Sequence, residues 1–273
     1  MLRLVTDSTA DLPTELVARH NILVVPAIVL LDGRPYRDGI ELSRGEFYER
    51  LPTLKQLPQT ASPAIGEYEA AYRQCGDADV ISLHMAAGLS GIYNAARLAA
   101  EPFGPRLTLV DTGQVSMGLG WQVIAAAEAI TAGQSLPAVL AAIKSTRRRV
   151  KVYALLDTLA YLRRGGRANA ITSSIGDILQ IKLIVELAES QVIQLVKHRT
   201  RSKAIEKLIE LAEALGPLER LAILHTQAPA EAEALAARLA SRAAQPPLIV
   251  EATSVIGTHV GPQALGIAAV KSE

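Results

Sequence analysis

The sequence contains a single cysteine, Cys75, and therefore no Cys-x-x-Cys pair. One thiol excludes a disulfide framework within the chain, and it excludes zinc clusters built from several cysteines. Chains without disulfides are typical of a reducing compartment, so the composition favours the cytoplasm. We expect neither a disulfide nor a bound metal.

Aromatic residues make up only 4% of the chain, whereas hydrophobic residues make up 49%. The core must therefore consist mainly of Ala, Leu, Ile and Val, and an apolar ligand would meet aliphatic walls. Lys and Arg number 28 against 27 Asp and Glu, a net charge of +1, and the basic residues are not interleaved with aromatics. Because binding of single-stranded nucleic acid needs basic grooves with stacking rings, we exclude nucleic acid as a partner.

Long hydrophobic runs are missing as well. A membrane-spanning helix needs about 20 apolar residues in succession. The longest apolar run here, residues 22–31, is shorter and contains Pro26. The first residues lack the apolar core of a signal peptide, because Asp7 interrupts them early. We expect a soluble, cytoplasmic protein.

The alternation of segments indicates the fold class. A chain of 273 residues favours two packed subdomains over one continuous α/β domain. Up to residue 153, continuously apolar strands alternate with helices, which indicates a parallel sheet covered on both faces. Beyond it, two strand-like runs flank Glu189 and Ser190, which is a hairpin signal. We predict an α/β protein with a Rossmann-like domain at 1–153 and an α+β domain with a mixed or antiparallel sheet at 154–273.

Ser90 stands between two glycines, after a predicted strand and before a predicted helix. Free backbone N–H groups and the helix dipole favour an anion at such a place. An ordinary N-cap serine is the alternative. A catalytic nucleophile is a third interpretation, but the nucleophile elbow needs a glycine where Ile92 stands. The local sequence leaves the first two interpretations open.

Two further hydroxyl groups lie in residues 59–63. A helix is expected to begin at Ser62-Pro63, which places Ser62 to cap it. Thr60 comes too early to cap that helix. We therefore expect Thr60 to be free to face a ligand.

The sequence does not support a nucleotide cofactor. Gly118 and Gly120 resemble part of a dinucleotide fingerprint, but its third glycine would fall on Val123. A Walker A pattern is missing too. The basic run at residues 147–149 is interpreted as a solvated helix end, where cations complement the helix dipole. No cofactor is predicted.

Two basic side chains stand beside glycines. Arg167 follows Gly165-Gly166, where a short predicted helix stops, so it is either a surface arginine or a guanidinium aimed at an anionic ligand. His259 lies between Gly257 and Gly261-Pro262, which predicts a constrained turn after a strand. The residues alone leave open whether His259 is a structural or a functional imidazole.

Nine motifs in register along almost the whole chain resemble the DegV family. They are "VTDSTADLP" at 5–13, "YRDG" at 36–39, "TASP" at 60–63, "LSGIYNAA" at 89–96, "VDTGQVSMGLG" at 110–120, "DTLAYLRRGGR" at 157–167, "IKLIVEL" at 181–187, "RTRSKA" at 199–204 and "IGTHVGP" at 256–262.

This resemblance implies a two-domain protein that holds a long-chain fatty acid between its domains. Members of the FakB type are carriers that present the fatty acid to a separate kinase subunit, which makes an acyl phosphate for phospholipid synthesis. Loading could involve peripheral contact with a membrane. The resemblance implies that the fatty-acid carboxylate is bound by Thr60, Ser90 and His259. It further implies a supporting or partner-facing set, namely Asp38, Ser62, Arg167 and Arg201.

The chain departs from the family pattern around the implied head group. Ala61 and Ser62 stand where the family has Ser and Gln, Ala86-Ala87 replaces Ser-Ser, and Ile92 replaces Thr. Two alternatives to the carrier therefore stay open. One is a serine hydrolase or acyltransferase with Ser90 as nucleophile and His259 as base. The other is a lipid-sensing scaffold.

Overall fold

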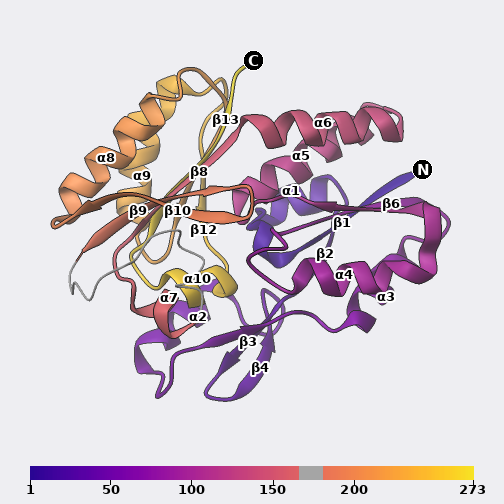
Figure 1. Ribbon diagram of the computed structural model, residues 1–273, viewed down its shortest axis with the longest axis horizontal. Coiled ribbons are helices and arrows are strands. Elements are labelled where there is room, and N and C mark those ends of the chain that lie inside the picture. Colours follow the sequence, from indigo (N-terminus) through magenta and orange to yellow (C-terminus); the bar gives the residue numbers. More distant parts are fainter. Residues whose placement is uncertain (166–180) are drawn as a thin grey trace.

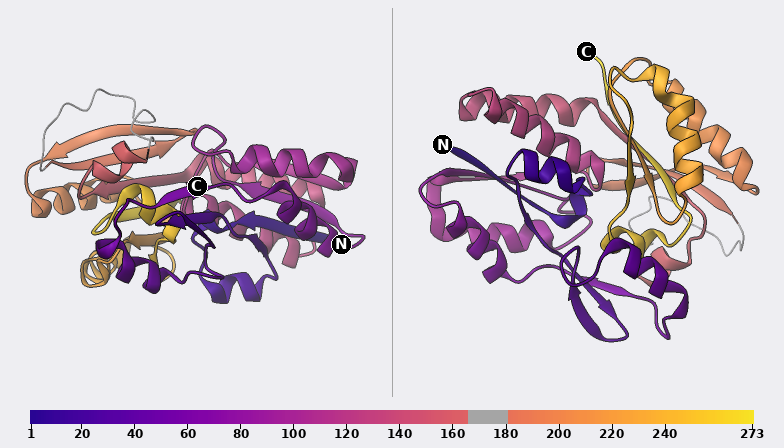
Figure 2. Two further views of the ribbon diagram at one scale, coloured as in Figure 1. Left: turned by 90° about the horizontal axis from the view of Figure 1, so that it is seen from below. Right: turned by 180° about the vertical axis from the view of Figure 1, so that it is seen from behind.

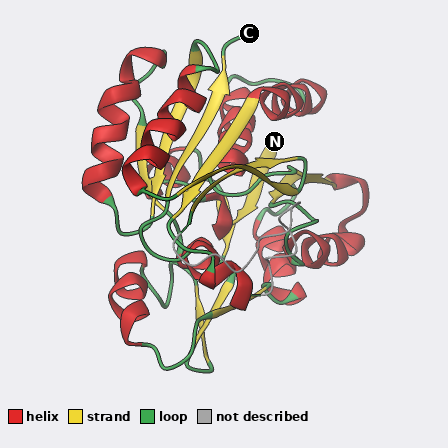
Figure 3. Cartoon of the chain, turned by 60° about the vertical axis from the view of Figure 1, so that its left-hand side comes forward, coloured by secondary structure: helices red, strands yellow, loops and turns green. Residues whose placement is uncertain are grey.

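The computed structural model describes residues 1–165 and 181–273, and it forms an α/β structure with three sheets (Figure 1). The two larger sheets run through the middle of the molecule, with helices on the outside (Figure 3). Arg167 falls outside the described residues.

The first sheet is parallel, with the strand order β2-β1-β6-β7. Its strands are β1 (Leu2–Asp7), β2 (Leu23–Val25), β6 (Asp79–His84) and β7 (Leu107–Asp111). The helices between or after them are α1 (Thr14–Arg19), α3 (Ile65–Gln74), α4 (Ile92–Ala100), α5 (Met117–Thr131) and α6 (Leu136–Arg149). β6 is buried at every position after its first, which is typical of a strand covered on both faces. The predicted Rossmann-like parallel sheet is confirmed.

The second sheet is mixed, with the order β10-β9-β8-β13-β11-β12. Its strands are β8 (Val150–Leu156), β9 (Lys182–Ala188), β10 (Gln191–His198), β11 (Leu218–His225), β12 (Leu248–Glu251) and β13 (Leu265–Lys271). β11 and β12 are parallel, and the other neighbours are antiparallel. The helices α8 (Arg201–Glu213) and α9 (Pro229–Leu239) pack together beside this sheet (Figure 2). The predicted mixed sheet is confirmed.

Strand β8 belongs to the second sheet, where it pairs with β9 and β13. The sequence assigned the start of this strand to the first domain, because it follows two helices that belong there. The predicted boundary after residue 153 therefore falls inside a strand. Which sheet a strand joins depends on partners far away in the sequence, and an apolar run does not reveal them.

The predicted hairpin is confirmed. Glu189 and Ser190 join β9 to β10 with φ angles of 46° and 65°, the left-handed pair of a tight hairpin turn. The tip is fastened to the first half of the chain. Ser190 N donates to Gly113 O at 3.0 Å, and Arg147 Nη2 lies 2.7 Å from Glu189 Oε2. The prediction of a solvated helix end is therefore wrong for Arg147, which fixes the hairpin.

A small antiparallel sheet, β4-β3-β5, lies at the bottom of Figure 1. It contains β3 (Ile28–Leu31), β4 (Arg34–Arg37) and β5 (Gln59–Ala61). The apolar run at residues 22–31 thus forms two strands in different sheets, interrupted near Pro26, which has no N–H to donate. Three short helices lie nearby, α2 (Arg44–Arg50), α7 (Ala160–Arg164) and α10 (Ser254–Val260). α10 contacts β3, β5, α2 and α7.

One hydrophobic cluster contains residues of both larger sheets. Helix α5 is buried along most of its length and contacts β1 in one sheet and β8 and β13 in the other. Trp121 Nε1 on this helix donates to Ala268 O of β13 at 2.9 Å. The halves of the chain are therefore packed against each other through α5, and the space beside this contact becomes a pocket.

Candidate functional site

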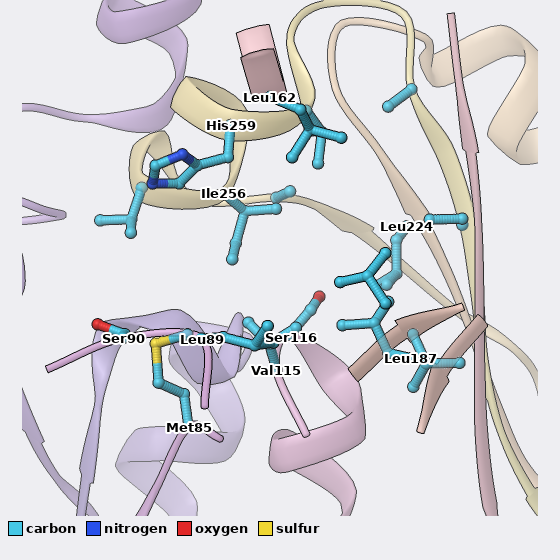
Figure 4. Close-up of a pocket in the computed structure, with 18 of the residues that line it drawn as sticks. Met85, Leu89, Ser90, Val115, Ser116, Leu162, Leu187, Leu224, Ile256 and His259 are labelled. Carbon is cyan, nitrogen blue, oxygen red and sulfur yellow. The ribbon is translucent and has the colours of Figure 1, made fainter. Parts of the chain in front are cut away.

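A cavity of about 320 Å³ lies where the three sheets meet. This volume is within the range of about 300–1,000 Å³ that is typical of small-molecule sites. Leu162, Leu187, Leu224 and Ile256 line its walls (Figure 4). The described lining contains no aromatic, acidic, lysine or arginine residue. The predicted aliphatic walls are present.

Thr60 contacts His259, and Ser62 lies against Gly91 next to Ser90, so two pairs of polar side chains line this pocket. Thr60 Oγ1 on β5 is 2.9 Å from His259 Nε2 on α10, and either atom can be the donor. Ser90 lies across the cavity from His259 (Figure 4). The structure thus brings Thr60, Ser90 and His259, which are far apart in the sequence, to one pocket. Their role in binding stays a prediction.

The other polar side chains of the lining either donate hydrogen bonds to other groups of the protein or carry no charge. Thr226 Oγ1 donates to Gly261 O at 2.7 Å, and Ser116 Oγ donates to the carboxylate of Asp11. Burial lowers the pKa of His225, so its imidazole is neutral at pH 7. The remaining polar cluster around His259 is the place where an anionic head group would be met by hydrogen-bond donors.

His259 lies in the last turn of a helix, so the prediction of a constrained turn is wrong. Helix α10 begins after Thr253, whose φ and ψ are extended, and ends at Gly261 with φ 75°. Close packing explains the glycine at position 257, because a Cβ there would lie 2.8 Å from Cε1 of Phe47 on α2. The glycine at 257 thus brings the helix close to an aromatic ring, while the histidine side chain faces the pocket.

Ser62 does not cap a helix. Helix α3 begins at Ile65, and Ala64 is its N-cap residue. The backbone N–H of Ala64 donates instead to Glu67 Oε2 at 3.2 Å. Ser62 lines the pocket, and a Cβ at Gly91 would lie 3.1 Å from Ser62 Oγ. The hydroxyl predicted to be structural is therefore beside the Ser90 loop.

Gly91, not Ser90, is the N-cap residue of α4, so the interpretation of Ser90 as an ordinary N-cap serine is wrong. Ser90 Oγ still accepts from Ile92 N, at the start of that helix, at 3.3 Å. It also lines the pocket. Within the described residues, no hydrogen bond joins Ser90 to His259, and the histidine pairs with Thr60. This geometry lacks the nucleophile–base contact that a serine hydrolase needs.

Arg201 lies in an ion-pair network at the start of α8. Its guanidinium contacts Asp157 Oδ1 at 2.9 Å and donates through Nε to Glu231 Oε1 at 2.8 Å. The hydrogen bond from Arg201 lowers the pKa of Glu231. Arg201 does not line the pocket. The structure thus places it in a contact between the α7, α8 and α9 regions.

Asp38 lies away from the pocket and is almost fully buried, accepting from Ser254 Oγ at the start of α10. Sequence reasoning missed the companion residue Asp11, which is fully buried and accepts from Thr253 N at 2.8 Å. It also missed Ser116, which has φ 55° and lines the cavity. Ser116 follows a parallel strand at its carboxyl end, where ligands of open α/β sheets gather, and that rule could have found it.

The buried position of Asp38 predicts a pH dependence of stability. Burial raises the pKa of Asp38 above its ordinary 3.8, against the lowering effects of Ser254, Ser8 and Arg44. The folded state therefore keeps this proton to a higher pH than the unfolded state. As pH rises from 3.8 through the raised pKa, the stability that the proton gives is lost.

Asp38→Asn keeps an acceptor for Ser254 and cannot ionise. We expect its free energy of unfolding, minus that of the wild type, to increase with pH across this window and then to level off. Urea unfolding at a series of pH values measures this difference. A difference that does not change with pH would contradict the prediction.

The described residues contain no group of three or more His, Cys, Asp or Glu side chains that could hold a metal ion. In the same part of the chain, no helix combines the length and the apolar character that a membrane crossing requires.

The structure thus combines a parallel sheet, a mixed sheet and an aliphatic pocket that is polar around His259. A family model described as "Uncharacterised protein, DegV family" matches residues 1–272. The chain belongs to the DegV family.

Relatives support this assignment along the full length. A DegV domain-containing protein of Streptomyces coelicolor is 38% identical, over 97% of this chain and 96% of that protein. Protein DegV of Bacillus subtilis is 33% identical, over 97% of this chain and 98% of that protein. Solved structures agree with the fold described above.

Two of these structures are described by their ligand. A DegV family protein from Thermus thermophilus, described by its fatty acid binding, has a TM-score of 0.90 and 35% identity. DegV from Bacillus subtilis, described as a fatty acid binding protein, has a TM-score of 0.89 and 31% identity. Each match covers 99% of both chains. The two-domain DegV fold predicted from the sequence is confirmed.

Proposed function

We propose that this protein is a carrier that binds a long-chain fatty acid in the cytoplasm and presents its carboxylate to a separate kinase subunit. The observation that supports it most is the composition of the pocket, which is aliphatic along its walls and polar around His259. A fatty acid has the same division into a long apolar chain and one polar end. The fatty acid binding described for the Thermus thermophilus and Bacillus subtilis proteins supports the same ligand.

The head group would be bound by hydroxyl and imidazole donors. Ser90 Oγ can offer one hydrogen bond to a carboxylate oxygen, and the Thr60–His259 pair can offer another, because one proton of that pair lies between the two side chains. No lysine or arginine lines the described pocket. A carboxylate without a lysine or arginine partner keeps electron density on its oxygens, so one oxygen can accept the terminal phosphoryl group of ATP at the kinase, with ADP as the leaving group.

The departures from the family pattern make this end of the pocket less polar. Ala61 and Ile92 line the cavity where the resemblance implies hydroxyl groups. Ser62 lines the same end and restores one hydroxyl. We infer that the carboxylate is held by Thr60, Ser90 and His259, with Ser62 as a supporting group. The hydrolase alternative is not favoured, because His259 pairs with Thr60 rather than with Ser90.

Mass spectrometry of the freshly purified protein tests this proposal. Under native conditions we expect a mass increment that disappears on denaturation and matches a long-chain fatty acid. Protein stripped of lipid should bind added fatty acid again. A protein that is empty and does not bind added fatty acids would contradict the carrier function.

The kinase step is tested in the same preparation. With ATP alone, the loaded protein should release no acyl phosphate. On addition of a fatty acid kinase subunit, acyl phosphate should form. Formation of acyl phosphate without the kinase, or hydrolysis of an acyl ester by the protein alone, would assign an enzymatic activity to this chain and contradict its role as a carrier.

A further inference from the structure

Helix α10 is too short to be stable alone, so its position depends on tertiary contacts. It has seven residues, whereas isolated helices shorter than about 12–15 residues are marginal in water. His259 lies in its last turn and lines the pocket. Whatever fixes α10 therefore also fixes the imidazole relative to Thr60 and Ser90.

Two buried carboxylates hold the beginning of this helix. Asp11 Oδ1 accepts from the backbone N–H of Thr253 at 2.8 Å. Asp38 Oδ1 accepts from Ser254 Oγ. Asp11 is fully buried and Asp38 is 3% exposed. Each contact gives a donor at the start of the helix a buried acceptor, and a buried donor without an acceptor is costly.

Each carboxylate is itself fixed by the first half of the chain. Asp11 has φ 54° and also accepts from Ser116 Oγ at the start of α5. The backbone N–H of Asp38 donates to Ala27 O, next to β3, at 2.9 Å. The carboxylates are thus held by the parallel sheet region and the small sheet, while α10 comes from the far end of the sequence. They thus connect the first half of the chain to the start of α10 in the second half.

Asp38 and Asp11 reach the histidine only through the helix. Ser254 is five residues before His259, which is about 7.5 Å along a helix axis. The hydrogen bonds that fix the histidine at its own end come from other residues, including Thr60. The contact of Asp38 is therefore with the base of the helix rather than with the head-group site.

We propose that Asp38 and Asp11 are positioning residues of the carboxylate-binding site, which hold the start of α10 so that His259 is presented to the ligand. This inference rests on the proposed fatty-acid function. It assigns to the two aspartates a role in ligand affinity that they fulfil without touching the ligand.

A double-mutant cycle between Asp38 and His259 tests the inference, with hexadecanoate as the probe. We expect Asp38→Ala to weaken hexadecanoate binding about tenfold, which is within the range of couplings between connected residues. Asp38→Asn, which keeps an acceptor oxygen for Ser254, should bind within about twofold of the wild type. In the His259→Ala background, Asp38→Ala should cause no further loss.

The same loss in both backgrounds would overturn the inference, because Asp38 would then act on the pocket in general. A second readout does not depend on the ligand. We expect the ring resonances of His259 in NMR spectra to shift in Asp38→Ala and to stay close to the wild type in Asp38→Asn. Unchanged ring resonances in Asp38→Ala would also overturn the inference.

The two readouts separate this inference from the proposed function. If the wild type does not bind hexadecanoate, or if His259→Ala binds it with wild-type affinity, the proposed head-group site fails, and the ring resonances still decide the positioning role. If Asp38→Ala does not fold, Ser254→Ala removes the same hydrogen bond from the helix side. Ser254→Ala is then tested by the same double-mutant cycle with His259→Ala and by the same ring resonances of His259.

Discussion

Replacing His259 by alanine should weaken binding of a long-chain fatty acid by about 10- to 150-fold, because a hydrogen bond to a charged group contributes roughly 1.5–3 kcal/mol. The imidazole lines the polar end of the pocket, and no lysine or arginine lies in the described lining to replace it. Calorimetric titration of the delipidated protein with the fatty acid measures this change in affinity. His259→Gln keeps a donor and should recover part of the affinity.

The matched control is His20→Ala. His20 lies at the end of α1, away from the pocket, so its removal should leave fatty acid affinity unchanged. If His259→Ala binds the fatty acid as tightly as the wild type does, the carboxylate is not held where we propose. An equal loss in both variants would point to a general effect of losing a histidine rather than to the site.

The second large effect concerns the length of the acyl chain. Leu187 on β9 lines the cavity far from Ser90 and His259 (Figure 4). Leu187→Trp should fill that end and leave a shorter channel. If four methylene groups of an 18-carbon acid can no longer be buried, the binding free energy weakens by about 0.8 kcal/mol for each group. The total of about 3 kcal/mol corresponds to a loss of affinity of roughly 150-fold. A 12-carbon acid should bind nearly as before.

Competition titrations with saturated acids of 12 to 18 carbons give this chain-length profile. Leu98→Trp is the matched control, because Leu98 is partly exposed on α4 and does not line the pocket. It should keep the wild-type profile. If Leu187→Trp weakens all chain lengths equally, the acyl chain does not extend toward β9, and the head group lies elsewhere in the cavity.

The sequence predicted those parts of the fold that follow from local pattern. Continuous apolar runs separated by helices gave the parallel sheet, since such strands must be covered on both faces. The hairpin at Glu189-Ser190 was predictable because two strand-like runs were separated by two residues. The aromatic-poor composition also predicted the character of the cavity, whose described lining has no phenylalanine, tyrosine or tryptophan.

Other features could not be read from local pattern. The residues of β8 look like one more strand of the first sheet, but their partners are β9 and β13. The segment around His259 has glycines on both sides, which predict a turn. It forms a helix, and two buried groups far away in the sequence, Asp11 and Asp38, accept hydrogen bonds at its start.

The sequence by itself determined the aliphatic nature of the protein and the succession of strands and helices, and it left open whether Ser90 and His259 have structural or functional roles. Thr60 and His259 are 199 residues apart in the sequence. Only the tertiary structure decided that Thr60 Oγ1 lies 2.9 Å from His259 Nε2. It also decided that Arg147 fastens a hairpin and that Asp38 serves the base of a helix. The physical reason is that propensity and periodicity act over a few residues, whereas a binding site is made by the packing of segments whose separation in sequence carries no local signal.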